Sequence, residues 1–272
     1  MRRSPLLLAF FFLALAAIGV VGYLFLLNVL SGKVGPFSAA IPAIFLALTA
    51  LAINWRFFKA EGRSLAEVGF DRSRLRFRQV TVAFVAGAIT VGAWIIAMRW
   101  ILPVAWRVAP TFRASAAAGS FVFVVFNNLG EELVYRSYLF LLLRRSYGTV
   151  VAIVSTSLLF TLLHIQAGVP WPNALAGVLT SALIYAALFV RWQSVPLVLG
   201  FHAGMNVTQE ALGLRGTGLT IFVPQFGAGI TAQQSSAVLV LAAVINVSLA
   251  VAVLLSARMF NLGTSTKACP DS

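Results

Sequence analysis

The chain has 272 residues, of which 60% are hydrophobic and only 10% are charged, and its mean hydropathy is +0.95. Water-soluble domains have roughly a quarter of their residues charged, so this composition excludes such a domain, and it excludes intrinsic disorder, which needs low hydrophobicity. The single cysteine excludes a disulfide scaffold. The chain is therefore predicted to be a polytopic integral membrane protein.

The hydrophobic pattern predicts an all-α fold, a bundle of about eight transmembrane helices. The expected spans are 5–30, 38–54, 80–103, 117–143, 149–164, 173–190, 195–211 and 236–256. The second, fifth and seventh are short for a hydrocarbon core of about 30 Å, so we expect them to be tilted, re-entrant or shielded by neighbours. The first stays apolar for too long to be a cleaved signal peptide, and we expect a retained helix there.

The formal net charge of +13 is attributed to membrane orientation rather than to nucleic-acid binding, because the basic residues lie between the apolar runs. With the N-terminus in the cytoplasm, 14 Lys and Arg residues fall on the cytoplasmic side and 5 on the outer side. The positive-inside rule then predicts that both termini are cytoplasmic, in the plasma (inner) membrane. The expected partners are the lipid bilayer and membrane-associated substrates, with no nucleic acid.

Two connecting segments allow alternatives. Residues 55–79 form the longest cytoplasmic stretch, which is either an amphipathic helix on anionic lipid or a plain basic loop. Residues 212–235 are rich in glycine and form either a gate that dips into the membrane or an ordinary outer loop.

Charges inside a bilayer are expensive, so each ionisable residue within a span is a candidate for a functional site. The span 117–143 carries Glu131, Glu132 and Arg136 in an otherwise apolar helix. Because Glu132 and Arg136 are four residues apart, they share a helix face and are expected to form an ion pair. Glu131 is rotated by about 100° from Glu132, so we expect it to be the free carboxylate.

The remaining polar candidates lie on two other spans. His164 ends the span 149–164, where the ring of Phe160, four residues earlier, is expected to wall the imidazole. His202 and Asn206 share a face of the span 195–211, and Glu210 continues their stripe to the span end, where we expect it to be solvated. Each group has a structural alternative, such as a helix brace or an interhelical hydrogen bond. Together, a carboxylate, two histidines and an amide can activate water and stabilise an oxyanion.

Three motifs on these spans resemble those of the CPBP family, the CAAX prenyl endopeptidase and bacteriocin-processing group also called Abi. EExxxR corresponds to residues 131–136, FxxxH to residues 160–164 and HxxxN to residues 202–206. The three occur in order, and they contain the only two histidines of the chain.

The resemblance implies an intramembrane endopeptidase of the glutamic type. It implies that Glu131 and His164 activate the attacking water and that His202 and Asn206 stabilise the oxyanion. Glu132 and Arg136 would support the site, with Phe160 beside them.

The resemblance covers the span region of residues 120–210, and together with the predicted topology it divides one membrane domain into three parts. Residues 1–115 hold N-terminal transmembrane helices and a basic cytoplasmic loop. Residues 116–211 form the catalytic helix core. Residues 212–272 hold an outer loop, the last transmembrane helix and a cytoplasmic tail.

The expected substrate is a membrane protein or a lipid-anchored or hydrophobic peptide. Prenylated C-termini, C-terminal anchor helices and bacteriocin precursors all remain open as substrates. No cofactor is expected.

Two alternatives to the glutamic mechanism stay open. In a zinc-dependent version of the protease, Glu131, His164 and His202 would bind the metal, although the chain has no HExxH motif. The other alternative is a non-catalytic membrane protein, such as a bacteriocin immunity protein, a scaffold or a transporter.

Overall fold

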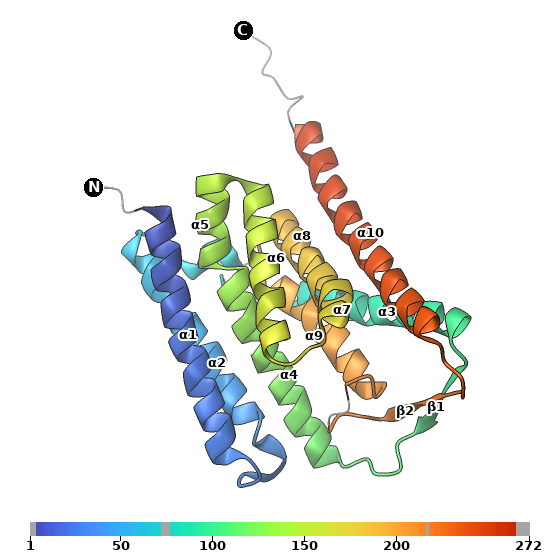
Figure 1. Ribbon diagram of the computed structural model, residues 1–272. Helices are drawn as coiled ribbons and strands as arrows, with labels where there is room; N and C mark the ends of the chain where they lie inside the picture. The colour runs from blue at the N-terminus through green and yellow to red at the C-terminus, as the bar shows by residue number, and fades with distance from the viewer. Residues whose placement is uncertain (1–3, 72–76, 216–217, 265–272) are drawn as a thin grey trace.

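The computed structural model describes residues 4–71, 77–215 and 218–264 and is mostly helical (Figure 1). In chain order the longer helices are α1 (Pro5–Leu30), α2 (Ala40–Ala60), α3 (Phe77–Ile101), α4 (Ala114–Tyr135), α5 (Tyr138–Tyr147), α6 (Thr149–Gln166), α8 (Thr180–Trp192), α9 (Val195–Ala211) and α10 (Ala232–Thr264). The shorter elements are η1 (Gly35–Phe37), η2 (Leu65–Val68), α7 (Trp171–Asn173), the π-helix η3 (Ala174–Leu179) and strands β1 (Val104–Val108) and β2 (Phe222–Phe226).

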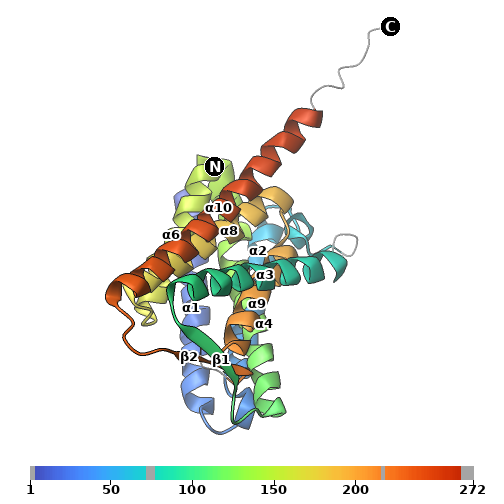
Figure 2. The same ribbon diagram turned by 90° about the vertical axis from the view of Figure 1, so that its right-hand side faces the viewer.

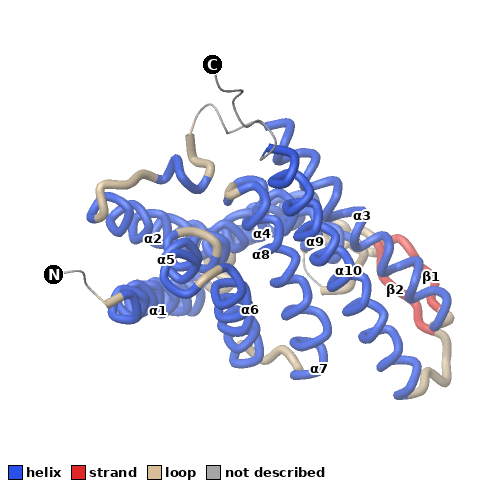
Figure 3. The backbone as a smooth tube through the Cα atoms, turned by 90° about the horizontal axis from the view of Figure 1, so that it is seen from above, coloured by secondary structure: helices blue, strands red, loops and turns tan. Residues whose placement is uncertain are grey.

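The helices form a central group with two flanks. Seen from above, α1 and α2 lie on one side and α3 and α10 on the other, with α4, α5, α6, α8 and α9 between them (Figure 3). The flanking helices expose many apolar side chains, among them Leu6 and Phe10 of α1 and Val240 and Val244 of α10. Such surfaces suit contact with lipid, so the central helices are the ones sheltered for a polar site.

The expected count of eight spans is not confirmed. Among the described residues, six helical segments are long and apolar enough to cross a membrane, and they make the chain a multi-pass integral membrane protein. The expected spans 117–143 and 195–211 are not among them. The first is broken into α4 and α5 and carries a polar run, and the second, α9, has 17 residues. The candidate spans are Pro5–Leu30, Gly35–Ala60, Phe77–Ile101, Thr149–Gln166, Trp171–Trp192 and Ala232–Ser256.

The all-α prediction missed a small sheet. β1 and β2 pair antiparallel, with Trp106 opposite Pro224. The strands lie near the C-terminal ends of α3 and α9, as Figure 2 shows for β1. The indole Nε1 of Trp106 in β1 donates a hydrogen bond of 3.1 Å to the carbonyl of Leu212, just after α9. Pro224 lacks an N–H, which is tolerated because an edge strand needs donors on one side only.

Residues 55–79 do not form one amphipathic helix. The segment begins as the last turn of α2, passes through η2 and ends in the first turn of α3, and residues 72–76 lie outside the described part. The segment 212–235 likewise contains β2 and the start of α10, with residues 216 and 217 outside the described part.

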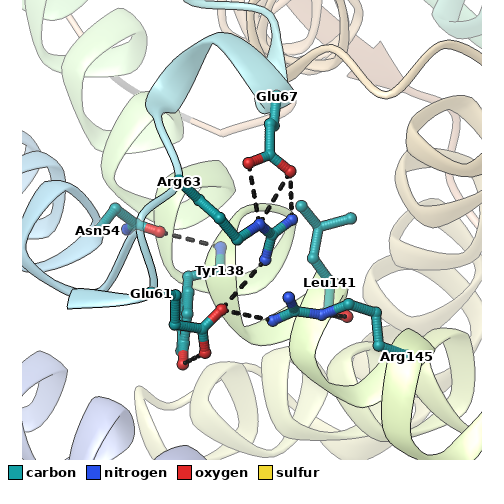
Figure 4. A network of polar contacts seen from close by, with 7 residues as sticks. All are labelled: Asn54, Glu61, Arg63, Glu67, Tyr138, Leu141 and Arg145. Atoms are coloured by element: carbon teal, nitrogen blue, oxygen red, sulfur yellow. Dashed lines mark hydrogen bonds and ion pairs between the residues drawn. The ribbon is translucent and has the colours of Figure 1, made fainter. Parts of the chain in front are cut away.

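The break between α4 and α5 is supported by one buried side chain of α2. Asn54 donates from Nδ2 to the carbonyl of Leu133 at 2.8 Å and to that of Ala50 at 2.8 Å. Its Oδ1 accepts from the backbone N–H of Tyr138 at 3.0 Å (Figure 4). Asn54 thereby satisfies backbone groups on both sides of the break, which would otherwise be buried without partners.

Helix α9 packs closely on α3 because glycines line their contact. A Cβ at Gly204 would lie 2.0 Å from the carbonyl oxygen of Phe84, and one at Gly87 would lie 2.1 Å from that of Phe201. Small residues of this kind let membrane helices approach closely. Gly204 and His202 lie on nearly opposite faces of α9, about 200° apart around the helix axis. The face with Gly204 therefore packs on α3, and the face with His202 points toward the interior of the bundle.

Candidate active site

The candidate site is a partly open cavity of about 350 Å³ lined mainly by the central helices. Four of the predicted catalytic residues, Glu131, His164, His202 and Asn206, line it, as does Phe160. The other lining residues are Trp94, Phe123, Asn127, Gly177, Val178, Ser181, Tyr185, Gln209, Glu210 and Arg215. The cavity can hold several water molecules, since one water occupies about 30 Å³ of the liquid.

Glu132 and Arg136 are both fully buried and form the expected ion pair, with 3.6 Å between Glu132 Oε2 and Arg136 Nε. Arg136 also donates to the carbonyl of Ala182 at 3.1 Å. Its guanidinium lies 5.0 Å from the centre of the Phe160 ring and 5.6 Å from that of Tyr185. The cation is therefore held by a carboxylate, a carbonyl and aromatic faces, which together offset its removal from water.

Glu132 has a second partner that the sequence did not predict. Its Oε1 lies 2.8 Å from Nδ1 of His202 on α9. A carboxylate can only accept, so Nδ1 carries the hydrogen and donates it. Nε2 of His202 then points toward Glu131, 3.7 Å from Oε2, and the ring of Tyr185 stacks on the imidazole with 4.2 Å between centroids.

Arg136 pairs with Glu132 rather than with Glu131. Glu131 nevertheless has a hydrogen-bond partner of its own. Its Oε1 accepts a hydrogen bond of 2.8 Å from Nδ2 of Asn127. The expectation of a free carboxylate is corrected in this respect, because Asn127 lies one turn earlier on the same face of α4.

His164 and Phe160 lie together on α6. The two rings are 4.3 Å apart between centroids, and Nδ1 of His164 lies 2.8 Å from the carbonyl oxygen of Phe160. A carbonyl only accepts, so Nδ1 donates and Nε2 is left as the nitrogen for a water or a substrate.

Asn206 is fixed by a second asparagine. Its Nδ2 donates to Oδ1 of Asn128 at 3.0 Å. This bond and the contact between Glu132 and His202 are two polar contacts between the antiparallel helices α4 and α9. These two contacts fix the rotation of α9 about its axis, so that His202 and Asn206 face α4.

The expectation that Glu210 is solvated was wrong. Glu210 is 2% exposed and lines the cavity. The chain turns back after α9, and Ile221 donates its N–H to the carbonyl of Ala211 at 2.9 Å, so the segment leading into β2 covers the end of the helix.

Sequence reasoning also missed several lining residues. Asn127 was detectable, because it precedes Glu131 by four residues. Tyr185 and Arg215 had no such signal, since they reach the cavity from other elements. Gly177 and Val178 belong to the π-helix η3, a rare form that is frequent at functional sites.

In the described residues, the three side chains suggested for zinc do not form a group close enough to bind a metal ion. In the described ranges, no group of three or more His, Cys, Asp and Glu side chains is close enough to hold one. Glu131, His164 and His202 share the cavity, but Nδ1 of each imidazole is already bonded to protein.

A bundle of membrane helices that encloses a carboxylate, imidazoles and an amide in one cavity defines the class of intramembrane enzymes. Residues 113–208 match the family model of the Rce1-like type II CAAX prenyl endopeptidases. These residues therefore resemble a domain of this family, whose members are peptidases, and the family implies an intramembrane protease acting on protein substrates. No curated protein and no solved structure matches the chain.

Proposed function

We propose that the protein hydrolyses peptide bonds of membrane-associated proteins or peptides with a water activated by Glu131 and His164, and with an oxyanion site made by His202 and Asn206. The observation that carries this proposal is that all four side chains line one cavity of about 350 Å³ among the central helices.

In the first step, the water oxygen bonds to the peptide carbonyl carbon while Glu131 takes one of its protons. Nε2 of His164 accepts the other hydrogen of the water in a hydrogen bond and so orients it. The carbonyl oxygen becomes an oxyanion, which requires donors in place before the charge develops. Asn206 supplies an amide N–H to it.

His202 can serve the oxyanion only under one condition. Its Nδ1–H is already donated to Glu132, so Nε2 must also carry a hydrogen if it is to donate to the substrate. The proposed role therefore requires a hydrogen on each ring nitrogen of His202, one donated to Glu132 and one to the oxyanion.

In the second step, the tetrahedral intermediate collapses. The bond from carbon to nitrogen breaks, and the proton held by Glu131 passes to the leaving amine. No covalent acyl-enzyme forms, and one water is consumed for each bond broken.

The substrate must present an unwound peptide bond, because carbonyls within a helix are already bonded and shielded. This favours cleavage close to the end of a membrane segment or within a tethered tail. Prenylated C-termini, C-terminal anchor helices and bacteriocin precursors all meet this requirement.

We also propose the orientation predicted above, with both termini cytoplasmic in the plasma (inner) membrane, and residues 116–211 as the catalytic core. The orientation is supported by the basic residues of the sequence, of which 14 fall on the cytoplasmic side and 5 on the outer side when eight spans are assumed.

The test uses the full chain in lipid vesicles with a mixture of membrane-derived peptides, whose new termini are identified by mass spectrometry. We expect new termini with the wild type and none with Glu131→Ala. A chelator should leave cleavage unchanged. Loss of cleavage with chelator and its recovery with zinc would support the zinc-dependent version instead, and equal termini from both proteins would favour a non-catalytic role.

A further inference from the structure

An asparagine pair precedes the glutamate pair of α4 by one helical turn. Asn127 and Asn128 stand four residues before Glu131 and Glu132, so each asparagine shares a face with one glutamate. Asn128 is buried and bonds to Asn206. Asn127 lines the cavity and donates to Oε1 of Glu131 at 2.8 Å.

We propose that Asn127 is a positioning residue that fixes the rotation of the Glu131 carboxylate and so selects the oxygen that takes the proton from water. This inference rests on the proposed function of Glu131.

The geometry gives the two oxygens of Glu131 different surroundings. Oε1 is held by the amide of Asn127. Oε2 is directed toward His202, where the 3.7 Å to Nε2 is longer than a hydrogen bond. The last torsion of a glutamate is broad, so without a donor at Oε1 the carboxylate plane could rotate away from this alignment.

An amide is suited to this task because it donates a hydrogen bond and does not titrate. The titratable side chains around the carboxylate are those of His202 and Glu210 on α9, His164 on α6, Tyr185 on α8, Arg215 after α9, Tyr23 on α1 and Tyr135 on α4 itself. Within the described part of the chain, Glu131 accepts its side-chain hydrogen bond from Asn127. Loss of that donor should therefore leave the carboxylate present but poorly aligned.

The first test needs no substrate. The full chain in lipid vesicles is prepared with glutamate labelled isotopically at the carboxyl carbon, and the infrared band of Glu131 is assigned as the one lost in Glu131→Gln. We expect this band to shift in Asn127→Leu, which removes the donor at similar size. The matched control is Asn173→Leu, at an exposed asparagine of α7, which should leave the band in place.

An unchanged Glu131 band in folded Asn127→Leu would overturn the inference whether or not the protein is a protease. Should Asn127→Leu fail to fold, Asn127→Gln moves the amide by one methylene and should also shift the band. An unshifted band in that variant would overturn the inference as well.

The second test uses a peptide cleaved by the wild type. Misalignment of a catalytic group costs about 10²-fold when it reaches 1 Å, so we expect kcat of Asn127→Leu to fall by about 10- to 100-fold with KM nearly unchanged and Asn127→Gln to recover part of it. A rise in KM alone would contradict a positioning role. An inactive wild type would count against the proposed function, while the infrared result would still decide the contact.

Discussion

At the residue scale, the site is a set of buried polar and charged side chains that contact one another within and between helices. The i, i+4 rule predicted the pair of Glu132 with Arg136. It did not predict the contact of Glu132 with His202, because helical periodicity relates residues within one helix only. Glu132 therefore has two tasks, one toward Arg136 and one toward His202.

Because Glu132 has these two contacts, exchanging the charges of Glu132 and Arg136 should affect stability and catalysis differently. Each of Glu132→Arg and Arg136→Glu leaves a buried charge without its partner, which costs about 3–5 kcal/mol. The double variant restores an ion pair and should recover part of the lost thermal stability in detergent. It should stay inactive, because position 132 no longer supplies the carboxylate that holds His202.

The outcome that would contradict this is a double variant no more stable than the worse single one, since the two side chains would then not be coupled. A double variant with normal turnover would show that His202 does not need the carboxylate of Glu132.

At the element scale, two features position the helices that carry the site: the hydrogen bonds of Asn54 at the break between α4 and α5, and the close packing of α9 on α3. The sequence predicted α4 and α9 as helices from their apolar patterns. The break at residues 136–137 and the close contact of α3 with α9 could not be predicted, because both depend on which helices become neighbours.

The glycine face of α9 gives one prediction. In Gly204→Ala the new Cβ would meet the backbone carbonyl of Phe84 at 2.0 Å, so α9 must move and the free energy of unfolding should fall by about 1–3 kcal/mol. Activity should fall with it, because His202 and Asn206 move with the helix. The control is Gly92→Ala on α3, where a Cβ meets nothing within 4 Å. Equal thermal stabilities for the two variants would contradict the close contact.

Asn54 gives a second prediction at this scale. Asn54→Leu removes the three hydrogen bonds to Ala50, Leu133 and Tyr138. Buried groups left without partners cost about 1–3 kcal/mol each, so the melting temperature in detergent should drop clearly. Asn54→Asp keeps the acceptor for Tyr138 but places a carboxylate oxygen against two buried carbonyl oxygens, so it should lose at least as much. A wild-type melting temperature for Asn54→Leu would mean that the break is held by other contacts.

At the scale of the whole molecule, the sequence predicted a helical membrane protein, and six of the eight predicted spans are long and apolar enough in the described residues to cross a membrane. Hydropathy cannot distinguish a helix that crosses lipid from one sheltered by other helices, and α9 is such a sheltered helix. The sheet was missed because its two strands come from segments more than a hundred residues apart.

A polar cluster on the side of the molecule where α2 ends joins distant parts of the chain. Glu61 accepts from the hydroxyl of Tyr138 at 2.6 Å and from Arg145 at 2.9 Å. Arg63 lies between Glu61 and Glu67 and bonds to both (Figure 4). The cluster ties α2 and η2 to α5.

This cluster should make the fold sensitive to acid. Burial acts to raise the pKa of Glu61, but the hydrogen bonds from Tyr138 and Arg145 outweigh it and hold that pKa below the ordinary 4.5. Hydrogen bonds from Arg63 likewise lower the pKa of Glu67. A lowered pKa in the folded state gives stability that is present above the ordinary value and is lost as the pH falls through the folded value.

We therefore expect the melting temperature of the wild type to fall as the pH is lowered below 4.5. Glu61→Gln should begin at a lower melting temperature at neutral pH and should lose less on acidification. Parallel pH curves for the two proteins would show that Glu61 makes no such contribution.

The most direct measurement of the central claim compares cells that produce matched amounts of the wild type, Glu131→Gln and Glu67→Gln. Glu67 is an acid of the α2–η2 segment and does not line the cavity. New termini of membrane and secreted proteins are then identified by mass spectrometry. The account predicts termini that occur with the wild type and with Glu67→Gln and are missing with Glu131→Gln. The same termini at the same abundance in folded Glu131→Gln would contradict it.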